Sequence, residues 1–377
     1  MVPFTCAQEF NSRSNFSFRK KFNLISFLFV SFLFLNLVSK NYIYNSLYPS
    51  LILFFIYALV YFYKGNKLEI YPLGISLFLV LWYFLIQLFQ HNGIFGFINI
   101  LMAMILGVGV SKGLVSPRHI VSLISIFLVV CLWNALEVFN SGISLFKISN
   151  HIAINSSRNL ISIHIIFLTT LYYFIASIDE RNISITPALI CFIITILAGG
   201  RSGVLSSAIL LAVVFLYSSH GSSIIRVTII LSVISLVAFN YTASLLDFFT
   251  VAGSDIRFSF IADYFLNYNA SYLVTGFDVK NAEFLSEFNG NPHNSYLNFL
   301  SSFGFGAILF LFITVFSSFL LILRKNYFPI LIITPFMIRM FTDSGLFMST
   351  YDLLFYAYFS LSLKKHKQYA FSSGYRT

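Results

Sequence analysis

The chain is poor in charged residues and in cysteine, and each shortage excludes a class of protein. Only 10% of its 377 residues are charged, whereas 58% are hydrophobic and 47 are Phe. A soluble domain of this length cannot bury so much apolar surface, so we expect a polytopic membrane protein. The three cysteines (Cys6, Cys131 and Cys191) are too few and too scattered for a disulfide framework or a metal site.

The N-terminal region is polar and basic over residues 1–21 and is followed by an apolar run over residues 22–38. A basic start and an apolar run are typical of a signal peptide. However, no small-residue cleavage pattern follows the run, and further apolar segments come after it. We therefore expect a first transmembrane helix that is retained, with residues 1–21 in the cytoplasm.

Apolar runs recur along the whole chain. A bilayer core about 30 Å thick needs roughly 20 apolar residues per helix, and fewer where the bilayer thins locally. On this basis we predict one integral membrane domain over residues 1–377 with about twelve transmembrane helices. They are Asn23–Val38, Leu47–Tyr63, Ile70–Phe89, Ile94–Val110, Ile120–Phe139, Leu160–Ile178, Ile183–Ala198, Val204–Tyr217, Ile224–Phe239, Leu297–Leu323, Tyr327–Met340 and Met348–Leu363. The segment Tyr327–Met340 contains two prolines, so a broken or re-entrant element is an alternative there.

The net charge of +10 is explained by membrane topology, not by a nucleic-acid partner. With the N-terminus in the cytoplasm and every helix crossing once, 16 of the 23 Lys and Arg residues fall inside. The bias follows the positive-inside rule and places both termini, including residues 364–377, in the cytoplasm. The basic residues left outside are Lys40, Lys147, Arg158, Arg201, Arg257, Lys280 and Arg339.

One outer connection, residues 240–292, is far longer than any other. Loops of this length with little structure of their own are usually functional. Part of this loop, Asp255–Asn267, has apolar residues on one helical face and polar residues on another, which predicts a helix in the membrane interface. The short first outer connection, residues 39–46, has no acidic residue.

The histidine at the end of this loop, His293, is the candidate catalytic base. It lies between Pro292, which favours a turn, and Asn294, which can cap the helix that follows. Histidine has an unperturbed pKa near ~6.5, so a small shift suits it to accept a proton at neutral pH. The alternative is a solvated loop histidine beside a helix cap.

Four outer arginines are candidate anion ligands. Arg201 follows two glycines in LAGGRSG, which permit a sharp turn and a close approach, and arginine at membrane depth is costly and usually functional. Arg158 begins the sixth predicted helix and Arg257 lies near the start of the interfacial helix. Alternatively, Arg158 is an interfacial anchor, and Arg339 forms an ion pair with Asp343.

These residues together suit transfer from a lipid diphosphate. The planar guanidinium group matches phosphate oxygens with two parallel hydrogen bonds. A base beside such a cation cluster can remove a proton from an incoming hydroxyl while the diphosphate leaves. Because the diphosphate gains negative charge as its bond breaks, the cations stabilise the transition state more than the ground state.

Three segments resemble the superfamily of O-antigen polymerases and O-antigen ligases, which are integral-membrane glycosyltransferases. In chain order they read GGRSGVLSSAI, SDIRFSFIADYFLNYNASYLVTGF and PHNSYLNFLSSFGFGA. His293, Asn294 and Gly304 match the ligase pattern, but Ala307 replaces its last glycine. The tail DSGLFMSTYDLLFYAYF is more similar to the polymerases, and the resemblance covers about residues 158–359.

The resemblance implies polymerisation of undecaprenyl-diphosphate-linked oligosaccharides at the periplasmic face of a bacterial inner membrane. In that family the loop histidine is the base and arginines hold the diphosphate, which carries over to His293, Arg201 and Arg257. Asn294, Asp343 and Asp352 are candidate contacts for the acceptor sugar. The alternative for the two aspartates is a solvated carboxylate at a helix end. No metal, cofactor or nucleic acid is expected. The expected partners are lipid-linked sugars, membrane lipids, and a chain-length regulator and flippase of the same pathway. The alternatives are an O-antigen ligase and a flippase or other transporter.

Overall fold

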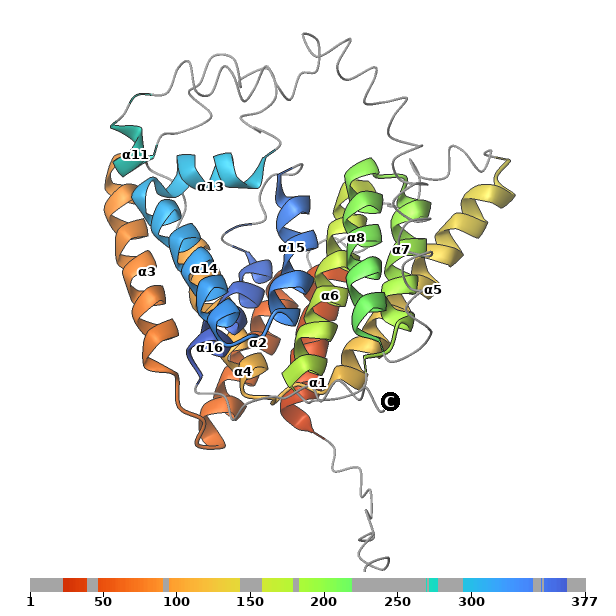
Figure 1. The fold of residues 1–377 in the computed structure, drawn as a ribbon, viewed down its shortest axis with the longest axis horizontal. Coiled ribbons are helices and arrows are strands. Elements are labelled where there is room, and N and C mark those ends of the chain that lie inside the picture. The colour runs from red at the N-terminus through yellow and green to blue at the C-terminus, as the bar shows by residue number, and fades with distance from the viewer. Residues whose placement is uncertain are drawn as a thin grey trace, which may run out of the picture.

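The computed structural model describes residues 23–38, 47–90, 95–142, 158–178, 183–218, 269, 271–276, 294–341, 347 and 349–364. Every regular element in these ranges is helical, which confirms the all-α part of the predicted fold class. The helices form a bundle with one short helix, α13, lying across one end (Figure 1). The predicted span Ile224–Phe239, the interfacial helix Asp255–Asn267 and both tails beyond Lys364 and before Asn23 lie outside the described residues.

The helices follow the apolar runs of the sequence. Their bounds are α1 Leu24–Leu33, η1 Phe34–Val38, α2 Leu47–Tyr63, α3 Ile70–Gln90, α4 Phe95–Ser111, α5 Pro117–Asn140, α6 Arg158–Ile178, α7 Thr186–Ala198, α8 Arg201–Tyr217, α11 Tyr272–Thr275, α13 Ser295–Phe303, α14 Phe305–Leu323, α15 Phe328–Met340, η5 Thr350–Asp352 and α16 Leu353–Leu363. Of these, η1 is a π-helical end to α1, and η5 is a 3₁₀ turn that leads into α16. Prolines stand at the starts of α5, α7 and α15, where a missing N–H costs nothing.

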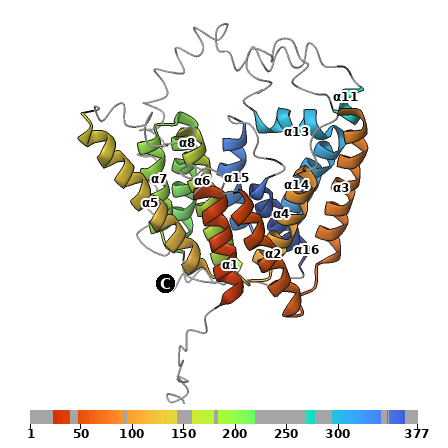
Figure 2. The same ribbon diagram turned by 180° about the vertical axis from the view of Figure 1, so that it is seen from behind.

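Helix α6 is the centre of the bundle. It is almost completely buried and packs against α5, α7, α8 and α15. Helices α1 and α2 cover the side seen in Figure 2. The outward faces of the peripheral helices carry large exposed apolar side chains, among them Leu59, Leu81, Val129, Trp133, Phe312 and Val315. Apolar surface of this extent marks contact with membrane or protein, as expected for a membrane protein.

Three described helices are long and apolar enough to cross a membrane by length and composition. They are Pro117–Asn140, Asn159–Ile178 and Phe305–Leu323, and seven shorter apolar helices accompany them. The count of twelve spans therefore stays a prediction. Helix α15 runs unbroken through Pro335, so it is a continuous helix and not the broken element considered from the sequence.

The predicted helix Leu297–Leu323 is wrong as one element. Gly304 adopts a φ of 49° and separates α13 from α14. A Cβ at this position would clash with the Val274 carbonyl oxygen and lie 2.6 Å from the Gly276 nitrogen. The backbone of the α11 segment therefore occupies the space that a side chain would need, and only glycine permits this bend. As a result, α13 turns across the bundle while α14 runs down its length (Figure 1).

The bundle has two ends, which we call the upper end and the lower end after their positions in Figure 1. The upper end carries α13, the starts of α6 and α8 and the end of α15. The lower end carries the start of α1 and the ends of α4 and α16, joined by hydrogen bonds such as that from Lys364 Nζ to the Ser111 carbonyl oxygen (2.6 Å). The described basic residues predicted to face the cytoplasm gather at the lower end: Lys64, Lys67, Lys112, Arg118, Arg324, Lys325 and Lys364.

Candidate functional site

The starts of α6 and α8 meet the end of α15 at the upper end, and the buried side chain of Arg339 connects them. Arg339 lies in the last turn of α15 and is 0% exposed. Its Nη1 donates to Ser202 Oγ at 2.7 Å, and its Nη2 donates to Ser162 Oγ at 3.2 Å. Nη2 also lies 3.4 Å from the Asn159 carbonyl oxygen. The rigid guanidinium fork suits this task, because it presents several donors in fixed directions.

The glycines around Arg201 allow α8 to lie against α6. Gly199 ends α7 with a left-handed φ of 63°, which confirms the sharp turn expected there. A Cβ on Gly203 would lie 2.7 Å from Ser162 Cβ and 2.8 Å from Ser162 Oγ. Helix α6 is therefore the element that lies closest to Gly203. This close contact brings the first turns of the two helices together, and with them the backbones of Arg158 and Arg201.

Helix α13 is attached to the same turn of α15. Asn294 caps α13, as predicted, since its Oδ1 accepts from the N–H groups of Tyr296 (3.0 Å) and Leu297 (3.1 Å). The Tyr296 hydroxyl donates to the Met337 carbonyl oxygen at 2.9 Å. Its ring packs against Phe341, with centroids 4.4 Å apart. The residue before the cap in the sequence is His293, which itself lies outside the described residues.

The electrostatics of the upper end favour an anion. The N-termini of α6, α8 and α13 each carry a partial positive charge from the helix dipole. Arg339 adds a basic side chain beside these starts, and its guanidinium donates to Ser162 and Ser202. Backbone N–H groups at a helix start are a common phosphate-binding element. The arrangement is therefore chemically suited to phosphate or carboxylate groups.

The structure describes some of the predicted site residues and leaves others untested. Arg158 and Arg201 are the first residues of α6 and α8, and Arg339 and Asn294 lie close by at the upper end. His293, Arg257 and Asp343 lie outside the described residues. The predicted ion pair between Arg339 and Asp343 therefore stays a prediction.

Asp352 has a structural role at the start of α16. It is 5% exposed, and its Oδ2 accepts from the Ser349 N–H at 3.3 Å in a capping box. The alternative of a solvated carboxylate at a helix end is therefore wrong, because the group is buried. The neighbouring Thr350 hydroxyl donates to Asn36 Oδ1 at 2.7 Å, which ties this turn to η1.

Sequence reasoning missed four residues of this region: Ser162, Ser202, Tyr296 and His164. His164 is 1% exposed on α6 and stacks on Tyr351 with centroids 5.9 Å apart. Serines within apolar helices are common packing residues, so Ser162 gave no sign of its partner 177 positions away. Ser202 could have been singled out only because it follows Arg201, and Tyr296 only because it follows a predicted helix cap.

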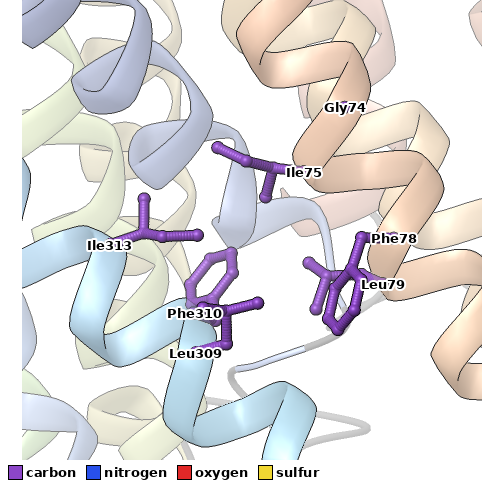
Figure 3. Close-up of a pocket in the computed structure, with 7 residues that line it drawn as sticks. All are labelled: Gly74, Ile75, Phe78, Leu79, Leu309, Phe310 and Ile313. Atoms are coloured by element: carbon purple, nitrogen blue, oxygen red, sulfur yellow. The ribbon is translucent and has the colours of Figure 1, made fainter.

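An apolar cavity of about 210 Å³ lies between α3 and α14 (Figure 3). It is lined by Gly74, Ile75, Phe78, Leu79, Leu309, Phe310 and Ile313. Hydrocarbon side chains offer no acid, base or hydrogen bond, so the cavity suits an acyl or isoprenoid chain and not a reacting group. Across the described parts of the chain, no three His, Cys, Asp or Glu side chains are grouped as metal ligands would be.

The comparisons with known proteins leave the chain without an assigned family. No family model matches it, and neither a curated protein nor a solved structure is significantly similar to it.

Proposed function

We propose that this protein is a glycosyltransferase that joins undecaprenyl-diphosphate-linked oligosaccharide repeat units into O-antigen or a related surface polysaccharide. The observation that carries the proposal is the convergence at the upper end. The starts of α6 and α8 meet the buried Arg339 there, at three of the sequence positions singled out for diphosphate binding, and α13 contacts the same turn of α15 through Tyr296. Helix starts offer backbone N–H groups to phosphate oxygens, and arginine at these positions is the residue type that suits a diphosphate leaving group.

In the proposed reaction the growing chain on its lipid is the donor, and a new lipid-linked repeat unit is the acceptor. The acceptor hydroxyl oxygen attacks the anomeric carbon of the donor, and the bond from that carbon to the diphosphate oxygen breaks. His293 takes the hydroxyl proton, and the diphosphate leaves with the electron pair. Arg201, Arg257 and Arg158 hold the leaving group, while Arg339 adds positive charge close behind α6 and α8.

The setting of the reaction is also part of the proposal. We place the protein in a bacterial inner membrane with about twelve spans, both termini in the cytoplasm and the upper end at the periplasm. The separation of basic residues supports this orientation, because Lys64, Lys112, Arg324 and Lys364 share the lower end. The apolar cavity between α3 and α14 offers room for part of an isoprenoid chain.

The lipopolysaccharide of a deletion strain, separated on a gel, tests the function. A polymerase defect leaves one repeat unit on the core. Full-length chains stranded on lipid would replace the proposal with the ligase. Unchanged lipopolysaccharide would remove both and favour a transporter.

Cysteine labelling tests the orientation, in a background with Cys6 replaced by Ser. Cys131 and Cys191 are buried, so they do not interfere. Ser271 is exposed near the upper end and Lys64 is exposed at the lower end. On spheroplasts, a membrane-impermeant thiol reagent should label Ser271→Cys and leave Lys64→Cys unlabelled. The reverse pattern would place the upper end in the cytoplasm and exclude periplasmic chemistry there.

A further inference from the structure

We infer that Tyr296 is a positioning residue of this site, and that the last turn of α15 is the anchor through which it acts. Tyr296 holds the start of α13, which directly follows His293 and its cap Asn294 in the chain, against α15. The inference rests on the proposed function, because it assigns to His293 the role of the base.

The hydrogen bond of Tyr296 uses a backbone group that a helix end leaves available. The last four carbonyl groups of an α-helix have no intrahelical N–H partner, and α15 ends at Met340. The N–H of Phe341 bonds to the carbonyl oxygens of Ile338 and Arg339 and leaves that of Met337. The Tyr296 hydroxyl donates to this Met337 oxygen at 2.9 Å. Tyr296 therefore completes the end of α15 while fixing the start of α13.

At the other end of α13, Trp82 Nε1 donates to the Phe303 carbonyl oxygen at 2.8 Å, and several aromatic contacts add to these two hydrogen bonds. The Tyr296 ring lies 5.4 Å from the ring of Phe347, and Phe299 stacks on Phe347 at 4.3 Å. Such contacts supply burial, but they tolerate sliding more readily than a hydrogen bond with a fixed acceptor. Among the described residues, the Tyr296 hydroxyl supplies a directional bond that joins the start of α13 to α15, whereas Trp82 joins the end of α13 to α3.

The same turn of α15 also fixes the arginine-bearing helices. Arg339 lies two residues after Met337 and donates to Ser162 on α6 and to Ser202 on α8. The last turn of α15 thus holds two parts of the site. Tyr296 attaches the start of α13 to it, and Arg339 attaches the starts of α6 and α8. Because catalysis depends on distances held to within about 1 Å, a shared anchor keeps base and anion site in register.

The test compares Tyr296→Phe with the matched control Tyr358→Phe. Both replacements remove one hydroxyl that bonds between two helices, and Tyr358 makes its bond to Ser318 at 2.7 Å, between α16 and α14. With purified protein and lipid-linked repeat units, Tyr296→Phe should lower kcat about 10-fold, whereas Tyr358→Phe should leave it unchanged. A shift of about 1 Å can cost up to roughly 100-fold, so a 10-fold loss fits a partial displacement.

A second background separates positioning from general damage. If Tyr296 acts through His293, Tyr296→Phe should change kcat less than about twofold when His293 is already Gln, since coupled residues are not additive. An equal loss in both backgrounds, or no loss in either, would overturn the inference.

Hydrogen exchange tests the anchor without reference to activity. Tyr296→Phe should speed amide exchange in Ser295–Phe303 about 5-fold, as loss of one hydrogen bond implies, and Tyr358→Phe should not. Unchanged exchange would exclude the anchor even in an active protein. A wild-type protein that forms no polymer would instead remove the proposed function, and the exchange result would still decide the anchor.

Discussion

The two ends of the bundle differ in where several of their basic residues lie along the helices. At the lower end, Arg324 donates to the carbonyl oxygens of Ser362 and Lys364, where α16 ends. Lys364 donates to the Ser111 carbonyl oxygen at the end of α4 and lies 3.8 Å from the Glu69 carboxylate. At the upper end, Arg158 and Arg201 are the first residues of α6 and α8.

The helix dipole explains why this difference matters. Cations stabilise a helix near its C-terminus, where carbonyl groups are unpaired, and anions stabilise it near its N-terminus. The lower-end cations therefore contribute to the fold. The pKa of Lys364 is lowered, because the effect of burial is larger than the opposing effect of the neighbouring Glu69 carboxylate. Arg158 and Arg201 stand where a helix favours negative charge, in keeping with the anionic ligand that we propose there, whereas Arg339 lies in the last turn of α15, where a helix favours a cation.

Replacing the candidate base should have the largest effect. His293→Ala should lower polymerisation about 10²–10⁴-fold, the usual contribution of a general base, without changing the amount of protein in the membrane. The lower-end control is His119→Ala, because His119 Nδ1 lies 2.7 Å from Ser26 Oγ, far from the site. The assay measures polymer on a gel with purified protein and a chelator present.

His293→Gln distinguishes the two roles of the histidine. Glutamine keeps a polar side chain but cannot take up the proton, so it should fail nearly as severely as alanine. Substantial activity in His293→Gln would leave a binding role and make Asp343 the next candidate for the base.

Changing arginine to lysine should affect the two ends differently. Arg201→Lys keeps the charge but loses the two-pronged geometry, and we expect a loss of activity of about 100-fold, similar to removal of one transition-state donor. Arg324→Lys at the lower end should reduce activity less than about twofold. If Arg201→Lys is as active as the wild type, the residue is only a point charge or an anchor, and diphosphate binding there is wrong.

A pair of glycines tests how closely the site helices pack. Gly203→Ala should destabilise the protein by about 1–3 kcal/mol, because the added Cβ would lie 2.7 Å from Ser162 Cβ. Gly74→Ala in α3 is the control, since nothing lies within 4 Å of its added Cβ. Thermal unfolding in detergent measures both. Equal transition temperatures would show that α6 and α8 separate easily and do not hold the site together.

The smallest effect is expected from the lower-end ion pair. Glu69→Gln removes the partner of Lys364, but the two side chains are 25% and 36% exposed, so the loss should stay below about 1 kcal/mol. Polymer formation should stay within about twofold of wild type. A severe loss of activity in stable protein would show that the lower end takes part in function, and the contrast between the ends would no longer hold.

The sequence by itself determined where most helices lie. Apolar runs and their polar interruptions predicted α2 with identical bounds and α6 within two residues at its start. Asn294 was predicted as a cap, and the structure confirms it. Both features depend on residues that are close together in the chain. A run of apolar residues is enough to predict a helix that needs burial, and a cap bonds to backbone N–H groups two or three residues away.

Only the tertiary structure decided the bend at Gly304 and the partners of Arg339. The bend depends on Val274 and Gly276, whose backbone fills the space beside Gly304. A glycine alone does not predict it, because Gly107 and Gly109 lie inside the continuous helix α4. Ser162 and Ser202 meet Arg339 across 177 and 137 positions of sequence. Such contacts depend on how whole helices pack, and many serines in apolar helices have the same local pattern. The choice among them is made when the helices come together.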